Sequence, residues 1–287
     1  MTTAHAAALP RHVVERAIKI AFAEDLGEAG DITSQATIDP KATAVARINA
    51  RGAGVVCGLD CAVGAFSLIG AGLETETFVA DGTIVSGGDA ILEVRGNARN
   101  LLAAERTALN FLTHLSGVAT LTRSFVLQTE GTDARICCTR KTTPGLRALE
   151  KYAVRCGGGH NNRFGLNDAI LIKDNHIAVA GGVTEAIAAA RAFAGHLVSV
   201  EVEVDTLDQL REALATDVNA ILLDNMDEDT LAQAVAITAG RAKLEASGNV
   251  TLERVAAIAR TGVDYISTSR ITTAAVPLDL GLDISID

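Results

Sequence analysis

The C-terminal half of the chain alternates short apolar, β-branched runs with helical patterns of about 10–14 residues. The six apolar runs are residues 134–139, 169–173, 198–204, 220–223, 242–246 and 264–267, and the helical patterns are residues 144–156, 183–194, 206–215, 229–239 and 252–260. Repeated strand–helix units of this size imply a parallel sheet with right-handed crossovers, and six in succession favour an α/β barrel, complete or incomplete. No GxGxxG sequence follows a predicted strand, which disfavours a dinucleotide-binding fold.

The N-terminal part has a different pattern. Residues 12–26 have the apolar spacing of an amphipathic helix, and residues 42–94 contain short strands separated by glycines. This combination predicts a small α+β domain. A long helical pattern over residues 98–129, with Gly117 as a candidate kink, then joins the two parts.

The change in pattern places the domain boundary near residue 115. We expect an N-terminal domain of residues 1–115 and a barrel domain of residues 116–274 that carries the active site. The tail, residues 275–287, is a candidate to return to the N-terminal domain and to be part of it.

Overall composition excludes several classes of protein. The net charge of −10 argues against binding to nucleic acid or to a membrane surface. No apolar run approaches the roughly 18 residues that span a bilayer, and residues 1–10 lack the basic and apolar regions of a signal peptide. Five cysteines without a CxxC pair or a metal spacing predict reduced, partly buried thiols. We therefore expect a cytoplasmic protein.

Positive charge is concentrated between Arg140 and Lys173. This window contains seven Lys or Arg residues and two acids, a net charge of +5 within an acidic chain. Such a cluster indicates a site for a small anion that carries several charges. Lys151 and Arg155 lie four residues apart on a predicted helix. The alternative for these two residues is that they form a solvated helix face and do not belong to the anion site.

Polar residues follow nearly every predicted strand of the barrel. They are Thr139, Arg140 and Lys141; Lys173, Asp174, Asn175 and His176; Glu201, Glu203 and Asp205; Asp224 and Asn225; Ser247, Gly248 and Asn249; and Ser267, Thr268 and Ser269. Active sites of α/β barrels lie at the carboxyl ends of the strands. We therefore predict a functional cluster there, and His176 is left open between a site residue and a structural one.

The third predicted strand alternates acids with valines, so its acids share one face. Buried carboxylates need a positive partner, which lysines, arginines or a metal would supply, and Lys141, Lys173 and Lys243 are candidates on neighbouring strands. Glu203 and Asp224 together are suited to Mg²⁺, which carboxylates bind in company with substrate phosphates. The alternative is an internal network of salt bridges.

Two loops are candidates for anion binding. Residues 157–163 join three glycines to Arg163, whose planar guanidinium matches carboxylate and phosphate. Residues 247–249 precede a predicted helix and resemble a phosphate cradle. The plainer interpretations are a helix stop for the first loop and an N-cap turn for the second.

Nine segments, taken together, resemble the quinolinate phosphoribosyltransferase family over nearly the whole chain. They are Thr139–Arg147, Lys151–Val154, Gly157–Gly159, Leu171–His176, Glu201–Asp205, Leu222–Asn225 and Glu245–Asn249, with Glu105–Asn110 and Leu115–Thr120 upstream. The resemblance implies an N-terminal α/β sandwich domain and an open, incomplete α/β barrel. It also implies a homodimer in which Arg106 reaches the neighbouring subunit's site.

The resemblance also implies roles for the polar residues by motif position. Arg140, Arg163 and Lys173 would hold the two carboxylates of quinolinate, Lys141 would contact phosphoribosyl pyrophosphate, Glu203 and Asp224 would face the ribose hydroxyls and Mg²⁺, and Ser247, Gly248 and Asn249 would hold the 5-phosphate. Lys141, Glu203 and Asp224 are thus the candidate catalytic residues. Ser267 and Ser269 are further candidates for substrate binding.

The sequence departs from the family at two places. Asn162 stands where the family has a histidine that contacts quinolinate, and it donates a hydrogen bond but carries no positive charge. His160, two residues earlier, is a candidate to compensate. Ser269 stands where the family often has glycine, and residues 272–274 replace a Thr-His-Ser sequence.

The resemblance implies transfer of phosphoribosyl to quinolinate with decarboxylation, giving nicotinate mononucleotide, CO₂ and pyrophosphate for NAD biosynthesis. Mg²⁺ is the implied cofactor. Three alternatives remain at this point: a related transferase for another aromatic acid, a Schiff-base aldolase that uses Lys173, and a non-catalytic sensor that kept the fold.

Overall fold

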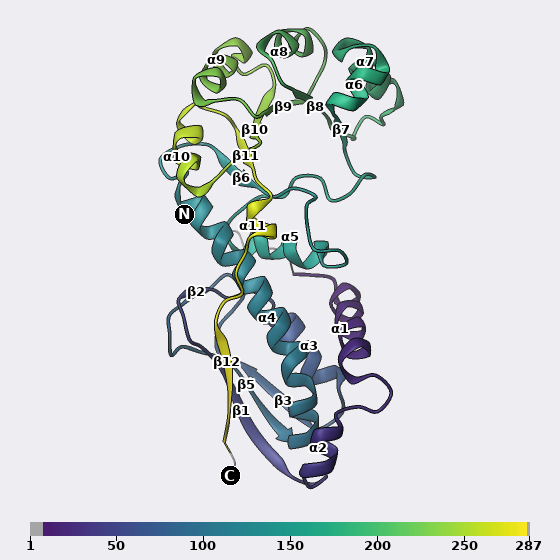
Figure 1. Ribbon diagram of the computed structural model, residues 1–287, viewed down its shortest axis with the longest axis vertical. Helices are drawn as coiled ribbons and strands as arrows, with labels where there is room; N and C mark the ends of the chain where they lie inside the picture. The colour runs from purple at the N-terminus through teal and green to yellow at the C-terminus, as the bar shows by residue number, and fades with distance from the viewer. Residues whose placement is uncertain (1–7, 286–287) are drawn as a thin grey trace. The chain divides into compact units, whose positions relative to one another are not determined.

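The computed structural model describes residues 8–285, which form two compact units (Figure 1). Within the described residues, the first unit comprises residues 8–123, Thr142–Gly158 and residues 272–285, and the second comprises Ser124–Lys141 and Gly159–Ile271. Residues 1–7, part of the segment considered for a signal peptide, lie outside the described residues.

A four-stranded antiparallel sheet forms the centre of the first unit, in the order β12-β1-β5-β3. The strands are β1 (Thr43–Ala50), β3 (Leu73–Thr77), β5 (Ala90–Asn97) and β12 (Leu280–Ser285), and a separate pair joins β2 (Gly54–Val55) to β4 (Ile84–Val85). Buried small or apolar residues alternate with more exposed residues along β1, so Ala46 and Ile48 lie on the buried face of the strand. Because β12 pairs with β1 from Leu280 to Ser285, the C-terminal segment belongs to this sheet.

Helices complete the first unit. They are α1 (Arg11–Leu26), α2 (Ile32–Thr37), α3 (Leu59–Leu68), α4 (Ala98–Leu127) and α5 (Arg147–Cys156), of which α4 extends into the second unit after Arg123. Helix α3 packs against both α1 and β3. Helix α4 is continuous through Gly117, the candidate kink. Helix α5 buries an apolar face that includes Leu149 and Val154 within this unit.

Six parallel strands form the second unit, in the order β6-β11-β10-β9-β8-β7. They are β6 (Arg135–Cys137), β7 (Ile170–Ile172), β8 (Val200–Val204), β9 (Ala220–Asp224), β10 (Lys243–Ser247) and β11 (Tyr265–Ser267). The edge strands β6 and β7 do not pair with each other, so the sheet stays open. The predicted open α/β barrel, with a sheet domain before it, is confirmed.

Helices α6 (Asp174–Ala180), α7 (Val183–Phe193), α8 (Leu207–Leu214), α9 (Glu228–Thr238) and α10 (Leu252–Arg260) follow the strands, and Figure 1 shows them along the outer side of the curved sheet. A short helix, α11 (Arg270–Thr273), comes after β11. Helix α6 is absent from the sequence prediction because none of its residues is buried, so it has no apolar periodicity.

Candidate active site

A cavity of about 590 Å³ opens at the carboxyl ends of the parallel strands of the second unit. Its lining includes twelve of the thirteen residues predicted as catalytic or substrate-binding: Arg140, Lys141, Asn162, Arg163, Lys173, Glu203, Asp224, Ser247, Gly248, Asn249, Ser267 and Ser269. The parallel order explains this convergence, because every strand delivers its carboxyl end to the same edge. The cavity therefore combines several cations with three carboxylates, those of Glu203, Asp224 and Glu245.

Lys173 and Glu203 form an ion pair across neighbouring strands. Lys173 directly follows β7, and its Nζ lies 2.5 Å from Oε2 of Glu203 in β8. Glu203 is buried, with 8% of its surface exposed, so it needs this partner. The predicted pairing of the β8 acids with Lys173 is thus confirmed for Glu203.

Asp224 is the second carboxylate of the cavity, at the end of β9. Burial raises its pKa, and the nearby carboxylates of Glu203 and Asp205 raise it further. A divalent cation would relieve this crowding. No third His, Cys, Asp or Glu ligand completes a preformed cage here among the described residues. This donor set fits Mg²⁺, which binds through one or two carboxylates and takes its other ligands from water and substrate phosphates.

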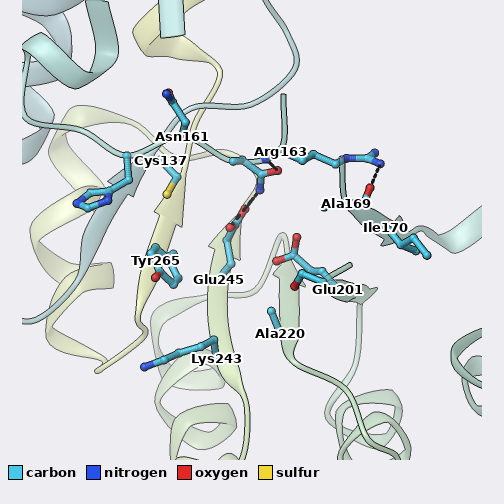
Figure 2. Close-up of a pocket in the computed structure, with 13 residues that line it drawn as sticks. Cys137, Asn161, Arg163, Ala169, Ile170, Glu201, Ala220, Lys243, Glu245 and Tyr265 are labelled. Carbon is cyan, nitrogen blue, oxygen red and sulfur yellow. Dashed lines mark hydrogen bonds between the residues drawn. The ribbon is translucent and has the colours of Figure 1, made fainter. Parts of the chain in front are cut away.

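The acids Glu201 and Glu245 lie deeper, beside a second cavity of about 280 Å³. Figure 2 shows the two side chains projecting from their strands toward the loop that carries Asn161 and Arg163. Burial raises the pKa of Glu201 to about 8, with Glu245 adding to the shift and Arg163 opposing it. Burial also raises the pKa of Glu245, which is 6% exposed. A protonated Glu201 carboxyl carries no charge, and Arg163 lies near enough to offset the charge of the ionised form. Glu201 therefore does not need a lysine partner.

The prediction that Lys243 balances these acids is wrong. Lys243 is the first residue of β10, at the amino end of the strand, and its Nζ lies 2.5 Å from Asp264. Figure 2 shows its side chain directed away from Glu201. The position of Lys243 near the start of the predicted strand 242–246 already places it at the amino end, away from the polar cluster at the carboxyl ends.

Backbone pairing positions the loop that carries Asn162 and Arg163. His160 donates from its backbone N to Ile136 O at 2.7 Å, and Cys138 N donates to His160 O at 3.0 Å, so the loop runs beside β6. His160 lines the smaller cavity and not the larger one, which removes it as a substitute for Asn162 at the substrate.

Arg163 is held inside the cavity. Its Nη1 donates to Ala169 O at 3.2 Å (Figure 2). Burial lowers its pKa, and the positive charge of Arg140 lowers it further. Two guanidinium groups that repel each other in a part-buried site form a strong receptor for a dianion.

The glycines before this loop serve packing more than anion binding. A Cβ on Gly157 would lie 2.4 Å from Ala119 O, so only glycine allows this approach. Gly158 has a φ of +88° and reverses the chain after α5. The helix-stop interpretation is therefore the right one for these two positions.

Residues 247–249 form a tight turn between β10 and α10. Gly248 and Asn249 both have positive φ, of +84° and +50°, and a Cβ on Gly248 would lie 2.2 Å from Oδ1 of Asn225. Asn249 donates from Nδ2 to the same Oδ1 at 3.0 Å. The N-cap of α10 is Thr251, so Ser247 to Asn249 are not a simple N-cap turn. Consecutive left-handed residues expose backbone amides to an anion.

Four residues considered in the sequence analysis lie outside the cavity: His176, Lys151, Arg155 and Arg106. His176 accepts a hydrogen bond at Nδ1 from Lys173 N at 2.9 Å, which makes it part of the start of α6. Lys151 is buried in α5, which corrects its interpretation as part of a solvated face, whereas Arg155 is exposed. Arg106 lies in α4 of the first unit with 64% of its side chain exposed, beside Glu105.

Sequence reasoning missed Arg270, which lines the cavity just after β11. Its position one residue after Ser269, at the carboxyl end of a predicted strand, is the signal that could have identified it as a site residue.

The fold and the cavity define an open α/β-barrel protein with a cationic site for small anions. Models of the N-terminal and C-terminal domains of quinolinate phosphoribosyl transferase match residues 31–116 and 118–283. A probable nicotinate-nucleotide pyrophosphorylase (carboxylating) of Bacillus subtilis is 44% identical over 92% of this chain and 91% of its own. Quinolinate phosphoribosyltransferase (decarboxylating) 2b of Nicotiana tabacum is 40% identical over 96% of this chain and 83% of its own.

Solved structures agree with these matches. The nicotinate-nucleotide pyrophosphorylase of Francisella tularensis superimposes with a TM-score of 0.93 at 39% identity, over 99% of this chain and 100% of that one. The chain belongs to the quinolinate phosphoribosyltransferase family.

Within the described residues, no helix is both long and apolar enough to cross a membrane.

Proposed function

We infer that the chain is a quinolinate phosphoribosyltransferase. It transfers phosphoribosyl from phosphoribosyl pyrophosphate to quinolinate and decarboxylates the product, giving nicotinate mononucleotide, CO₂ and pyrophosphate for NAD biosynthesis. Family membership supports this reaction, and one observation in the structure carries it: a single cavity holds Arg140, Arg163 and Lys173 beside Glu203 and Asp224.

The cations would bind quinolinate. Its two carboxylates require at least two fixed positive groups, and Arg140 and Arg163 present planar guanidinium groups for this task. Lys173 keeps its ion pair with Glu203 while offering further N–H donors, because an ammonium group has three. We place Lys141 against phosphoribosyl pyrophosphate, and the amides of Gly248 and Asn249 against its 5-phosphate.

The transfer step breaks the bond between ribose C1 and the pyrophosphate oxygen while the pyridine nitrogen bonds to C1. Positive charge develops on the ribose, and the carboxylates of Glu203 and Asp224 stabilise it through space. Mg²⁺, held by Glu203 and Asp224, would neutralise the departing pyrophosphate.

Decarboxylation follows from the charge on the ring. After transfer the ring nitrogen is cationic, so cleavage of the bond between C2 and its carboxylate leaves a carbanion stabilised by the adjacent positive charge. CO₂ leaves, and a proton takes its place at C2. The enclosing cations orient the ring, and the chemistry needs no essential general base from the chain.

The assembly we propose is a homodimer in which Arg106 of one subunit contributes to the site of the other. Two observations support it. Arg106 projects into solvent with 64% of its side chain exposed, and it lies outside the cavity that holds the other predicted site residues. The cytoplasmic location expected from the sequence stays a prediction.

A second candidate, transfer to another aromatic acid, is favoured by Asn162 alone. The family's histidine could carry a charge at this position, whereas the Asn162 amide is neutral and bonded to Glu245. Thermal unfolding with each acid separates the two candidates. Protection by quinolinate, and not by nicotinate or benzoate, supports the proposed substrate. Protection by another acid in its place would establish the second candidate.

A further inference from the structure

Two cysteines and an aspartate meet in the first unit, on residues that do not line the cavity of the second. Cys57 follows β2, Asp81 precedes β4, and Cys156 is the last residue of α5. One ligand atom from each, the two sulfur atoms and a carboxylate oxygen, all lie within 4.8 Å of one another. Their spacing in the sequence gives no sign of this, because three separate segments supply the three side chains.

Cys57 is buried, whereas Asp81 and Cys156 are half-buried. Cys57 is 0% exposed, and burial raises its pKa well above the ordinary thiol value, with Cys156 and Asp81 adding to the shift. Burial also raises the pKa of Asp81. The charges that contribute to these two shifts are anionic, so a cation bound among the three groups would offset them.

Asp81 is already positioned by hydrogen bonds from the backbone of Gly58 and Leu59 and from the Tyr152 side chain. Oδ1 accepts from Leu59 N at 3.1 Å, and Oδ2 accepts from the Tyr152 hydroxyl at 2.9 Å. A carboxylate has about four lone-pair sites, so it keeps capacity for a further partner. The bonds fix the carboxylate beside the two sulfur atoms, as outer partners fix the ligands of a metal.

We propose that Cys57, Asp81 and Cys156 bind a thiophilic divalent cation of the Zn²⁺ type. Two thiolates and one carboxylate match the sulfur and oxygen ligands of Zn²⁺, and a water molecule would fill the fourth tetrahedral position. Bond lengths of about 2.3 Å to sulfur and 2.0 Å to oxygen set ligand separations of roughly 3.5 Å. Atoms that already lie within 4.8 Å reach this geometry by small side-chain movements.

A disulfide between the two cysteines accounts for the cluster less well. Disulfide formation needs an oxidant, which the chain does not supply. A disulfide would also bring no positive charge to the Asp81 carboxylate beside the two sulfur atoms. A divalent cation instead stabilises both thiolates and offsets the carboxylate.

The test is a titration of the reduced, chelator-treated full chain with Cd²⁺, a probe for Zn²⁺ sites. We expect one equivalent to bind with the near-ultraviolet charge-transfer band of cadmium–thiolate bonds, which carboxylate sites such as Glu203 and Asp224 do not produce. Cys156→Ser should weaken binding roughly 100-fold and remove most of the band, because only the Cys57 thiolate remains. Asp81→Asn should weaken binding and keep the band. Cys138→Ser, at a buried cysteine of the other unit, should change neither.

Two further measurements distinguish loss of metal binding from loss of folding. Circular dichroism and the Tm of each variant establish that it is folded before Cd²⁺ is added, and Cys57→Ala serves as a second ligand variant. Zn²⁺ should raise the Tm of the native chain and leave that of Cys156→Ser unchanged. Absence of a stoichiometric band in the native chain, or a band that persists undiminished in both cysteine variants, would overturn the proposal.

Discussion

Asn162 donates from Nδ2 to both carboxylate oxygens of Glu245, at 3.2 and 3.3 Å. Its Oδ1 accepts from Arg163 N at 2.6 Å. Both ends of the amide are thus used within the protein, one toward the barrel interior and one toward the residue that binds substrate. Asn162 is therefore a positioning residue for Arg163 at least as much as a contact for quinolinate.

Asn162→Ala should raise the KM for quinolinate about tenfold and change kcat little, because Arg163 loses its support but keeps its charge. Steady-state kinetics with each substrate varied in turn will measure the changes in KM and in kcat separately. Asn162→Asp serves as a check: it keeps the acceptor oxygen but places a carboxylate against Glu245, so it should be worse than alanine. Equal loss for the two variants would show that the bond to Glu245 is unimportant.

Arg163→Ala should weaken quinolinate binding roughly 100-fold, since it removes a part-buried charged partner of a carboxylate. Binding of phosphoribosyl pyrophosphate should change far less. Calorimetric titration with each ligand alone will test this, and the exposed Arg155→Ala is the matched control. Equal losses for both ligands would contradict the assignment of Arg163.

Asp224→Asn should raise the Mg²⁺ concentration for half-maximal rate about tenfold, because the variant removes one of two carboxylates of the site. The rate is measured against Mg²⁺ at saturating substrates. Asp229→Asn, on the exposed first turn of α9, should leave the curve unchanged. An unaltered curve for Asp224→Asn would place the metal elsewhere.

The Glu201 carboxyl gives the free energy of unfolding a defined dependence on pH. Its pKa rises from 4.5 in the unfolded chain to about 8 in the fold, so the folded state binds more protons between these values. Stability contributed by this group is therefore present at low pH and is lost as pH rises from about 4.5 through 8. Glu201→Gln, which stays neutral, should be less sensitive to pH in urea unfolding at pH 5.5 and 8.5. The same slope in both proteins would mean that Glu201 titrates normally.

Subunit mixing tests the shared site. Arg106→Ala and Lys141→Ala chains should each be nearly inactive as pure dimers. In a mixed dimer one of the two sites would receive both native residues, so an equilibrated equal mixture should recover about a quarter of native activity. Recovery of none, from a mixture shown to exchange subunits, would mean that Arg106 acts within its own chain.

The barrel could be predicted because its strands are short, apolar and regularly spaced, and because parallel strands bring their polar ends together. Lys173, Glu203 and Asp224 were found in this way. Helix α6 could not be predicted, since it buries no residue, and the ion pair of Lys243 with Asp264 could not be predicted, since the sequence does not show which side chains meet.

Long-range packing explains the remaining differences. Gly157 resembles part of an anion-binding loop in the sequence, and only the fold reveals that it lies against Ala119. The meeting of Cys57, Asp81 and Cys156 likewise depends on three distant segments. The protonated state of Glu201 depends on burial beside Glu245, which a pattern of alternating acids does not reveal.

The central claim is that this cavity couples phosphoribosyl transfer to decarboxylation of quinolinate. The most direct test supplies the purified protein with Mg²⁺, phosphoribosyl pyrophosphate and quinolinate labelled at its 2-carboxylate. We predict that labelled CO₂ and nicotinate mononucleotide appear in equal amounts and that both vanish when Mg²⁺ is removed. A folded protein that binds both substrates and releases neither product would contradict the account and indicate a sensor that kept the fold.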